Sequence, residues 1–243
     1  MRAWHGLSSQ FAYTWAHALD EISQYRAAIL DDAFNKHLDY GNSDFDTRHL
    51  FTINLTYDIP RASWATSGWS KRLVNDWQIS SIINLHSGQP YDELLSGLNQ
   101  IGDPFSGVSH SFDSSLPGVQ WINPSAFCSP AKDAGCGGAP VSRNRFVGPN
   151  FKDVDFSVIK NIPIKERLAL QLRADMFNLF NRTNFASGVG TVNLSCAEDL
   201  TLHHCTSLAG FGQVNDTIGD FNGAPGLGPG EQFNMQLAVK LRW

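Results

Sequence analysis

The last residues of the chain, 232–243, read Gln-Phe-Asn-Met-Gln-Leu-Ala-Val-Lys-Leu-Arg-Trp. Every second side chain is large and apolar, and this face consists of Phe233, Met235, Leu237, Val239, Leu241 and Trp243. The side chains between them are amides, one alanine and two cations. Because successive side chains of a strand point to opposite faces, this period of two predicts a β-strand with one apolar and one polar face.

Five earlier segments repeat the alternation, with exceptions such as Ile82. The expected strands cover residues 7–20, 46–59, 74–87, 151–161, 166–182 and 231–243. Each is longer than the roughly 5–6 residues that are usual in globular proteins. Each is also long enough for the roughly 9–11 residues that a tilted membrane-spanning strand needs. Strand length therefore favours a membrane barrel.

The connections between these strands alternate in length. The long ones cover residues 21–45, 88–150 and 183–230, and the short ones cover 60–73 and 162–165. Outer-membrane barrels have short periplasmic turns, long extracellular loops and a polar interior. The polar faces of the expected strands are rich in Gln, Asn, Ser and Thr, which suits such an interior. We therefore predict an all-β fold, an antiparallel transmembrane β-barrel segment with long extracellular loops.

Composition excludes several other classes of protein. Charged residues make up 17% of the chain, yet no apolar run approaches the roughly 20 residues of a transmembrane helix. With 18 basic and 23 acidic residues the net charge is −5, which argues against a nucleic-acid partner. A soluble β-sandwich binding module stays open as an alternative, because a half-buried strand shows the same alternation.

Six strands are too few to close a barrel, since known barrels start at about 8. Unpaired strand edges are not tolerated in hydrocarbon, where no water is available to bond them. The N-terminal residues also lack the apolar core of a signal peptide. We therefore expect the chain to be the C-terminal part of a larger barrel, incomplete on its own.

Five short motifs follow one another along the chain. They are residues 39–49 (DYGNSDFDTRH), 77–80 (WQIS) with 87–90 (SGQP), 121–127 (WINPSAF), 143–149 (RNRFVGP) running into 153–157 (DVDFS), and 176–185 (MFNLFNRTNF). In this order they resemble the TonB-dependent outer-membrane receptors, and in particular the Oar-like, carboxypeptidase-regulatory-like branch. Each motif is short, but together they span most of the chain.

The resemblance implies a barrel of roughly 22 strands around a plug, in the bacterial outer membrane. It also implies uptake of a small-molecule, glycan or peptide ligand, driven by TonB through an N-terminal box. This sequence shows neither plug nor box, so TonB is expected only through a missing N-terminal region. A non-transporting surface-binding or structural protein is the alternative. We expect neither an enzyme nor a cofactor.

The terminal strand carries a second implication. Its apolar side chains and final aromatic resemble the signal that the barrel-assembly machinery reads. An amphipathic strand can pair edge to edge with another sheet during insertion. We therefore expect this machinery and outer-membrane lipid to be partners of the chain.

The four cysteines fall in two of the long connections. Cys128 and Cys136 lie in one and Cys196 and Cys205 in another, on the side where disulfides persist. We predict the pairs Cys128–Cys136 and Cys196–Cys205, although four cysteines allow three pairings. A metal site of Cys196 and Cys205 with the adjacent His203–His204 pair is the alternative, but its spacing does not match ordinary zinc sites.

Two groups of charged residues complete the candidates. Asp153, Asp155, Arg173 and Asp175 fall on the polar face of neighbouring strands, which predicts an ion-pair network in the lumen, with a substrate path as the alternative. Asp39, Asp44 and Asp46 stand beside Asn42 and suggest calcium. They lack the Gly and terminal Glu of a calcium loop, so a turn leading into the next strand is favoured.

Overall fold

The structure is a computed structural model. It describes residues 2–23, 34–35, 37, 39–90, 97–111, 119–165, 168–185, 197–199, 201, 203–206, 212–214, 217 and 232–242. Within these residues no helix is long and apolar enough to cross a membrane.

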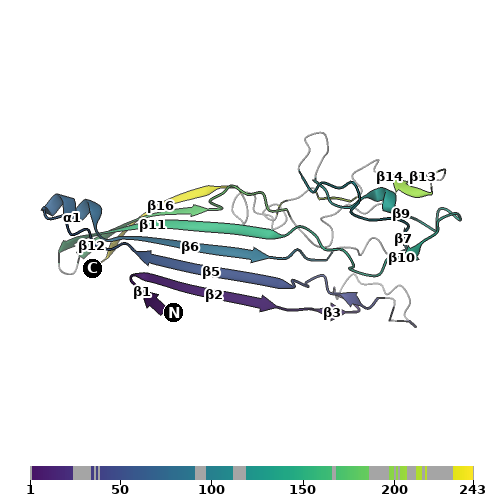
Figure 1. The fold of residues 1–243 in the computed structure, drawn as a ribbon, viewed down its shortest axis with the longest axis horizontal. Coiled ribbons are helices and arrows are strands. Elements are labelled where there is room, and N and C mark those ends of the chain that lie inside the picture. The colour runs from purple at the N-terminus through teal and green to yellow at the C-terminus, as the bar shows by residue number, and fades with distance from the viewer. Residues whose placement is uncertain are drawn as a thin grey trace.

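One antiparallel seven-stranded sheet, in the order β1-β2-β5-β6-β11-β12-β16, forms the long body of the molecule (Figure 1). Its strands are β1 (Arg2–Trp4), β2 (Leu7–Trp15), β5 (His49–Asp58), β6 (Trp77–His86), β11 (Phe151–Lys165), β12 (Leu168–Phe177) and β16 (Asn234–Arg242). Neighbours in the sheet follow one another along the chain. This confirms the predicted all-β antiparallel architecture.

The strand register sorts side chains into rows that cross the sheet. One row consists of Leu7, Tyr57, Ile79, Val158, Ala174 and Leu237. The adjacent row on the opposite face consists of Ser8, Thr56, Ser80, Ser157, Asp175 and Gln236. A slip of one residue between any two strands would break both rows. The alternation along each strand thus becomes one apolar and one polar face of the whole sheet.

The sheet has two edges, at β1 and at β16, and among the described residues neither edge pairs with a further strand. The apolar side chains of β16 are correspondingly exposed, with Leu237 at 72% and Val239 at 71%. Met235 and Leu241 are exposed on the same strand, whereas Trp243 lies outside the described residues. The described sheet is therefore open, not a closed barrel.

The connections gather at two opposite ends of the sheet (Figure 1). The short connections, α1 (Gly68–Val74) and the last residue of β16 lie at one end, which we call the turn end. At the other end, the loop end, lie the three long connections. Antiparallel order requires this separation, because consecutive connections must leave the sheet at alternate ends.

The strand ends differ from the predicted ranges. Residues 68–74 form α1, which begins after the cap Ser67, so the strand predicted from residue 74 starts only at Trp77. β11 continues to Lys165, so residues 162–165, predicted as a turn, are strand. β2 stops at Trp15, and residues Leu19–Asp20 form a separate strand, β3, paired with β4 (Gly41–Asn42).

The long connections contain short elements that the sequence does not reveal. They are β7 (Asn99–Gln100), β8 (Val119–Gln120), η3 (Pro124–Ala126), β9 (Phe127–Cys128), β10 (Ala139–Pro140), β13 (Ala197–Asp199), β14 (His204–Thr206) and β15 (Gln213–Val214). These pair into small sheets at the loop end. Their strands are only two or three residues long, so the alternation along the sequence does not reveal them.

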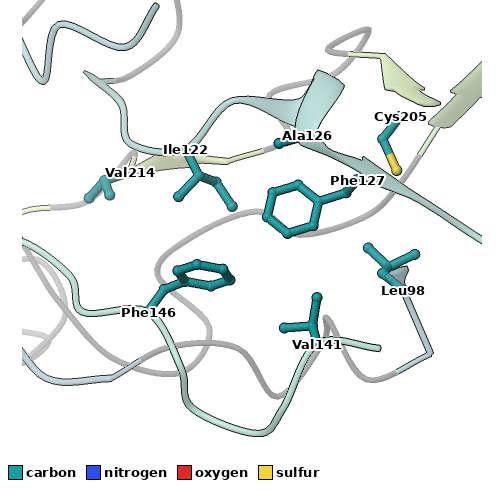
Figure 2. Packing of buried hydrophobic residues seen from close by; sticks show 8 residues of the cluster. All are labelled: Leu98, Ile122, Ala126, Phe127, Val141, Phe146, Cys205 and Val214. Carbon is teal, nitrogen blue, oxygen red and sulfur yellow. The ribbon is translucent and has the colours of Figure 1, made fainter. Parts of the chain in front are cut away.

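The buried hydrophobic cluster of the described residues also lies at the loop end (Figure 2). It consists of Leu98, Ile122, Ala126, Phe127, Val141, Phe146, Cys205 and Val214. The rings of Phe127 and Phe146 meet edge to face, with centroids 5.8 Å apart. We call this cluster the loop core. The long sheet contributes no member to it, which is expected where apolar side chains face lipid instead of a protein interior.

Two adjacent positions of β16 test the assignment of the faces. Leu237→Arg should lower the free energy of unfolding in phospholipid vesicles by about 2–4 kcal/mol, because the cation enters hydrocarbon from mid-strand. Gln236→Arg places the same charge on the polar face and should change this free energy far less. Urea titrations of both variants make the comparison. Equal losses would contradict the two-faced sheet.

Candidate functional site

The polar face carries a chain of hydrogen bonds near its middle. Asp175 accepts from the Ser157 hydroxyl at 2.5 Å and pairs with Arg173 Nε at 2.6 Å. Asp153 and Asp155 lie nearer the loop end, where Asp155 accepts from the backbone N–H of Asn178 at 3.1 Å. The four charged residues predicted as one network therefore form two separate groups. The strand register keeps them apart, because Arg173 lies opposite Ile159 and not opposite either carboxylate.

Amide side chains extend this polar face toward the turn end. Gln171 donates to Asn161 at 2.9 Å and accepts from Arg242 at 3.1 Å. On the neighbouring strands Gln78 donates to Asp58 at 2.7 Å. The face therefore presents hydroxyl, amide and carboxylate groups along most of its length, as the interior of an outer-membrane barrel does.

The motif at residues 176–185 forms an asparagine-rich turn at the end of β12. The Asn178 side chain bonds the Arg182 backbone twice: its Nδ2 donates to the carbonyl at 2.8 Å, and its Oδ1 accepts from the N–H at 2.9 Å. Asn181 accepts from the backbone N–H of Phe233 at 2.9 Å, just before β16. Both asparagines have φ of 46°, a left-handed conformation that this residue type tolerates well. The motif thus joins β11, β12 and β16 where the sheet meets the loops.

A buried arginine joins two of the long connections. The Arg143 guanidinium donates to Asp20 Oδ1 at 2.6 Å and to Ser23 Oγ at 2.8 Å, and it lies 3.4 Å from Asp44 Oδ1. Its side chain is only 15% exposed. Burial alone would raise the pKa of Asp20, but hydrogen bonds from Arg143, Ser43 and Ser23 outweigh burial and hold this pKa below the ordinary value of 3.8. We call this group the arginine latch.

The next residue completes the latch. Asn144 is fully buried, and its side chain donates to Asp44 Oδ1 at 2.6 Å and to the Asn42 carbonyl at 2.8 Å. Asn42 returns a bond to the Asn144 carbonyl at 2.7 Å. Asp46 accepts from the backbone N–H of Ala18 at 2.9 Å. Asp44 and Asp46, considered for calcium, thus bind protein groups, and no described cluster of acidic, His or Cys residues could hold a metal ion.

A disulfide closes a small ring within the second long connection, and an ion pair joins this ring to the third. The disulfide joins Cys128 to Cys136, and the backbone N–H of Gly135 donates to Asp133 inside this ring at 2.7 Å. Asp133 also pairs with His203 from the last long connection. The Gly135 amide first, and then His203, lower the pKa of Asp133 below its ordinary value, against the effect of burial.

The second cysteine pair is described only in part. Cys205 is disulfide-bonded and fully buried, so it is no metal ligand. Cys196 lies outside the described residues, and its pairing stays a prediction.

The three long connections thus form one packed body, which we call the loop unit. The loop core, the pairing of β8 with β15 and the Asp133–His203 pair join the second connection to the third. The arginine latch joins the first to the second. Near the core the His110 ring stacks on Trp121 at 4.2 Å. In the sequence, Arg143, Asn144 and Trp121 stand out only as members of the family motifs, because the residues that they contact are remote in the chain.

Removal of the latch should loosen the loop unit without unfolding the sheet. Arg143→Met leaves the partly buried Asp20 and the buried Asp44 without their cation and should lower the free energy of opening of the loop unit by about 1–3 kcal/mol. Arg145→Met, an exposed arginine two residues away, should cost less than about 1 kcal/mol. Hydrogen exchange of loop-unit amides measures both values. Similar exchange in the two variants would exclude the latch.

The free energy of opening of the loop unit should depend on pH through Asp133. Its pKa is lowered on folding, so the stabilisation is complete above the ordinary carboxyl value of 3.8 and is lost as the pH falls through the lower folded pKa. The free energy of opening, from urea titrations between about pH 5 and about pH 2, should therefore fall with acid. Asp133→Asn should remove this part of the pH dependence. An unchanged acid profile in that variant would refute the assignment.

Comparison with known proteins identifies the family to which the chain belongs. The family model of an outer membrane beta barrel domain matches residues 1–223. No curated protein and no solved structure matches the chain. The family agrees with the long antiparallel strands, the two-faced sheet and the gathering of long loops at one end, and it excludes the soluble sandwich. The chain therefore belongs to the outer membrane beta barrel domain family and is a protein of the bacterial outer membrane.

Proposed function

We propose that this chain forms part of the wall and the surface loops of a TonB-dependent receptor-like protein that binds a ligand at the cell surface and takes it up. The observation that carries this proposal is the loop unit. Long loops of outer-membrane barrels are extracellular, and binding residues are concentrated on loops held by a rigid scaffold. A loop unit with its own core, placed at the mouth of a polar face, suits capture of a ligand.

The polar face supports the second half of the proposal, a route inward. Asp153 and Asp155 lie next to the loop end, and the Asp175 group follows deeper along the sheet. The Asp153 side chain is nearly buried, and its Oδ1 has no hydrogen-bond partner among the described residues. Because this oxygen is buried, it could accept a bond from the hydroxyl or amine of a ligand only after the side chain turns outward. The proposed role is binding and passage of a small molecule, glycan or peptide, without bond chemistry and without a cofactor.

Two protein partners belong to this proposal. TonB would engage a region N-terminal to this chain and supply the energy for uptake. The barrel-assembly machinery would read β16, whose apolar side chains are exposed along a free edge of the described sheet. The sequence similarity to the Oar-like receptors supports both partners, and the net charge of −5 gives no reason to add nucleic acid.

The packing of the loop unit also favours a second function, adhesion or surface binding without transport. A core, a disulfide and a buried latch make the loops a fixed surface rather than a set of moving gates. A surface that holds one shape can bind a partner at little cost in conformational entropy.

Binding of TonB separates the two functions. Outer membranes that contain the whole protein should retain the purified periplasmic domain of TonB, and membranes from cells lacking the gene should not. The Arg143→Met variant should retain TonB normally, because the latch lies at the loop end and TonB would bind on the periplasmic side, where the turn end lies. Absence of specific retention by the whole protein would contradict the transport proposal and leave surface binding as the function.

A further inference from the structure

The connection between β5 and β6, at the turn end, exposes more apolar surface than a short turn needs. It contains α1, on which Trp69 is 79% and Leu73 is 66% exposed. These residues are four apart, so their side chains lie on the same face of the helix. Trp64, just before the helix, is 70% exposed. Single exposed apolar residues are common, but three large ones within ten residues form a patch that calls for a partner.

Two side chains of the apolar face hold the C-terminal end of this helix. Trp77 and Lys160 lie opposite each other in the register of β6 and β11. The indole N–H of Trp77 donates to the Leu73 carbonyl at 2.8 Å, and the Lys160 ammonium donates to the Asn75 carbonyl. The ammonium also lies 5.1 Å from the centre of the Trp77 ring. The helix is therefore tied to the lipid-facing side of the sheet, at the level where the apolar face ends.

Cations surround the same helix. Arg61, Lys71 and Arg72 line a hollow of about 500 Å³, and the one acidic residue among its lining residues is Asp76. Arg61 pairs with Asp76 at 2.8 Å, whereas the ion pairs found among the described residues do not include Lys71 or Arg72. Both of these side chains are exposed. The hollow thus has an excess of positive charge beside an exposed indole.

We propose that residues 61–74 form a membrane-interface anchor that binds the headgroup of an anionic phospholipid. Trp69 and Leu73 lie at the boundary of headgroups and acyl chains, and Lys71 and Arg72 bind the lipid phosphate. Indole rings and cations combine in this way at membrane surfaces. Because the long loops are extracellular, the anchor lies in the periplasmic leaflet. Charge complementarity and continuity with the lipid-facing sheet both identify lipid as the occupant, whichever ligand the loop end binds.

Quenching by brominated lipid tests where the helix lies. The full chain is reconstituted in phosphatidylcholine vesicles, and brominated phosphatidylcholine or brominated phosphatidylglycerol is added. Because the chain has 7 tryptophans, the Trp69 signal is the difference between the wild type and Trp69→Phe. We expect brominated lipid to quench this signal, most strongly with bromine near the headgroup. A Trp69 signal quenched by iodide in water and not by brominated lipid would overturn the proposal.

The cations are tested in the same vesicles. In the wild type, brominated phosphatidylglycerol should quench Trp69 at lower mole fractions than brominated phosphatidylcholine does. The variant Lys71→Gln with Arg72→Gln should lose this preference, by roughly fivefold for each charge removed. The control Lys132→Gln with Arg145→Gln removes two exposed charges at the loop end and should keep it. A preference absent from the wild type, or equal in both double variants, would overturn headgroup binding.

Discussion

A backbone that crosses hydrocarbon must satisfy every N–H and C=O within the protein, because no water is present to bond them. The antiparallel ladder meets this condition between β1 and β16, strand by strand, whereas the outer edges of these two strands have no partner among the described residues. Once the ladder is fixed, the period of two along each strand sorts the side chains into two faces, and what remains is which face meets lipid. The row through Ile79 and Leu237 faces lipid, and the row through Ser80 and Gln236 faces the interior.

The loop end obeys the opposite condition. Water surrounds these segments, so burial there follows the ordinary rules of a soluble domain. A core forms around Phe127 and Phe146, and a charged side chain such as Arg143 is buried because carboxylates and hydroxyls complete its hydrogen bonds. The molecule thus has two parts stabilised in different ways, a ladder with lipid as its outer neighbour and a loop unit with its own interior.

Much of this organisation could be read from the sequence, for a physical reason. Strands such as β5 and β6 show the alternation because their two faces meet different surroundings, and the pattern needs no knowledge of the partner strand. Seven helical residues are too few for a period of 3.6 to stand out, so α1 stayed hidden. Ion pairs between remote segments leave no periodic trace at all. Arg143 and Asp20 are 123 positions apart, and only the folded chain brings them together.

The faces of the sheet can be measured directly on β5, a strand with neighbours on both sides. Spin labels placed one at a time from residue 50 to residue 57 in membranes report collisions with oxygen, which concentrates in lipid, and with a water-soluble nickel complex. Labels at Phe51, Ile53, Leu55 and Tyr57 should favour oxygen, and labels at Thr52, Asn54 and Thr56 should favour nickel. Accessibility without this period of two, or uniformly high accessibility to nickel, would contradict a sheet that separates lipid from a polar interior.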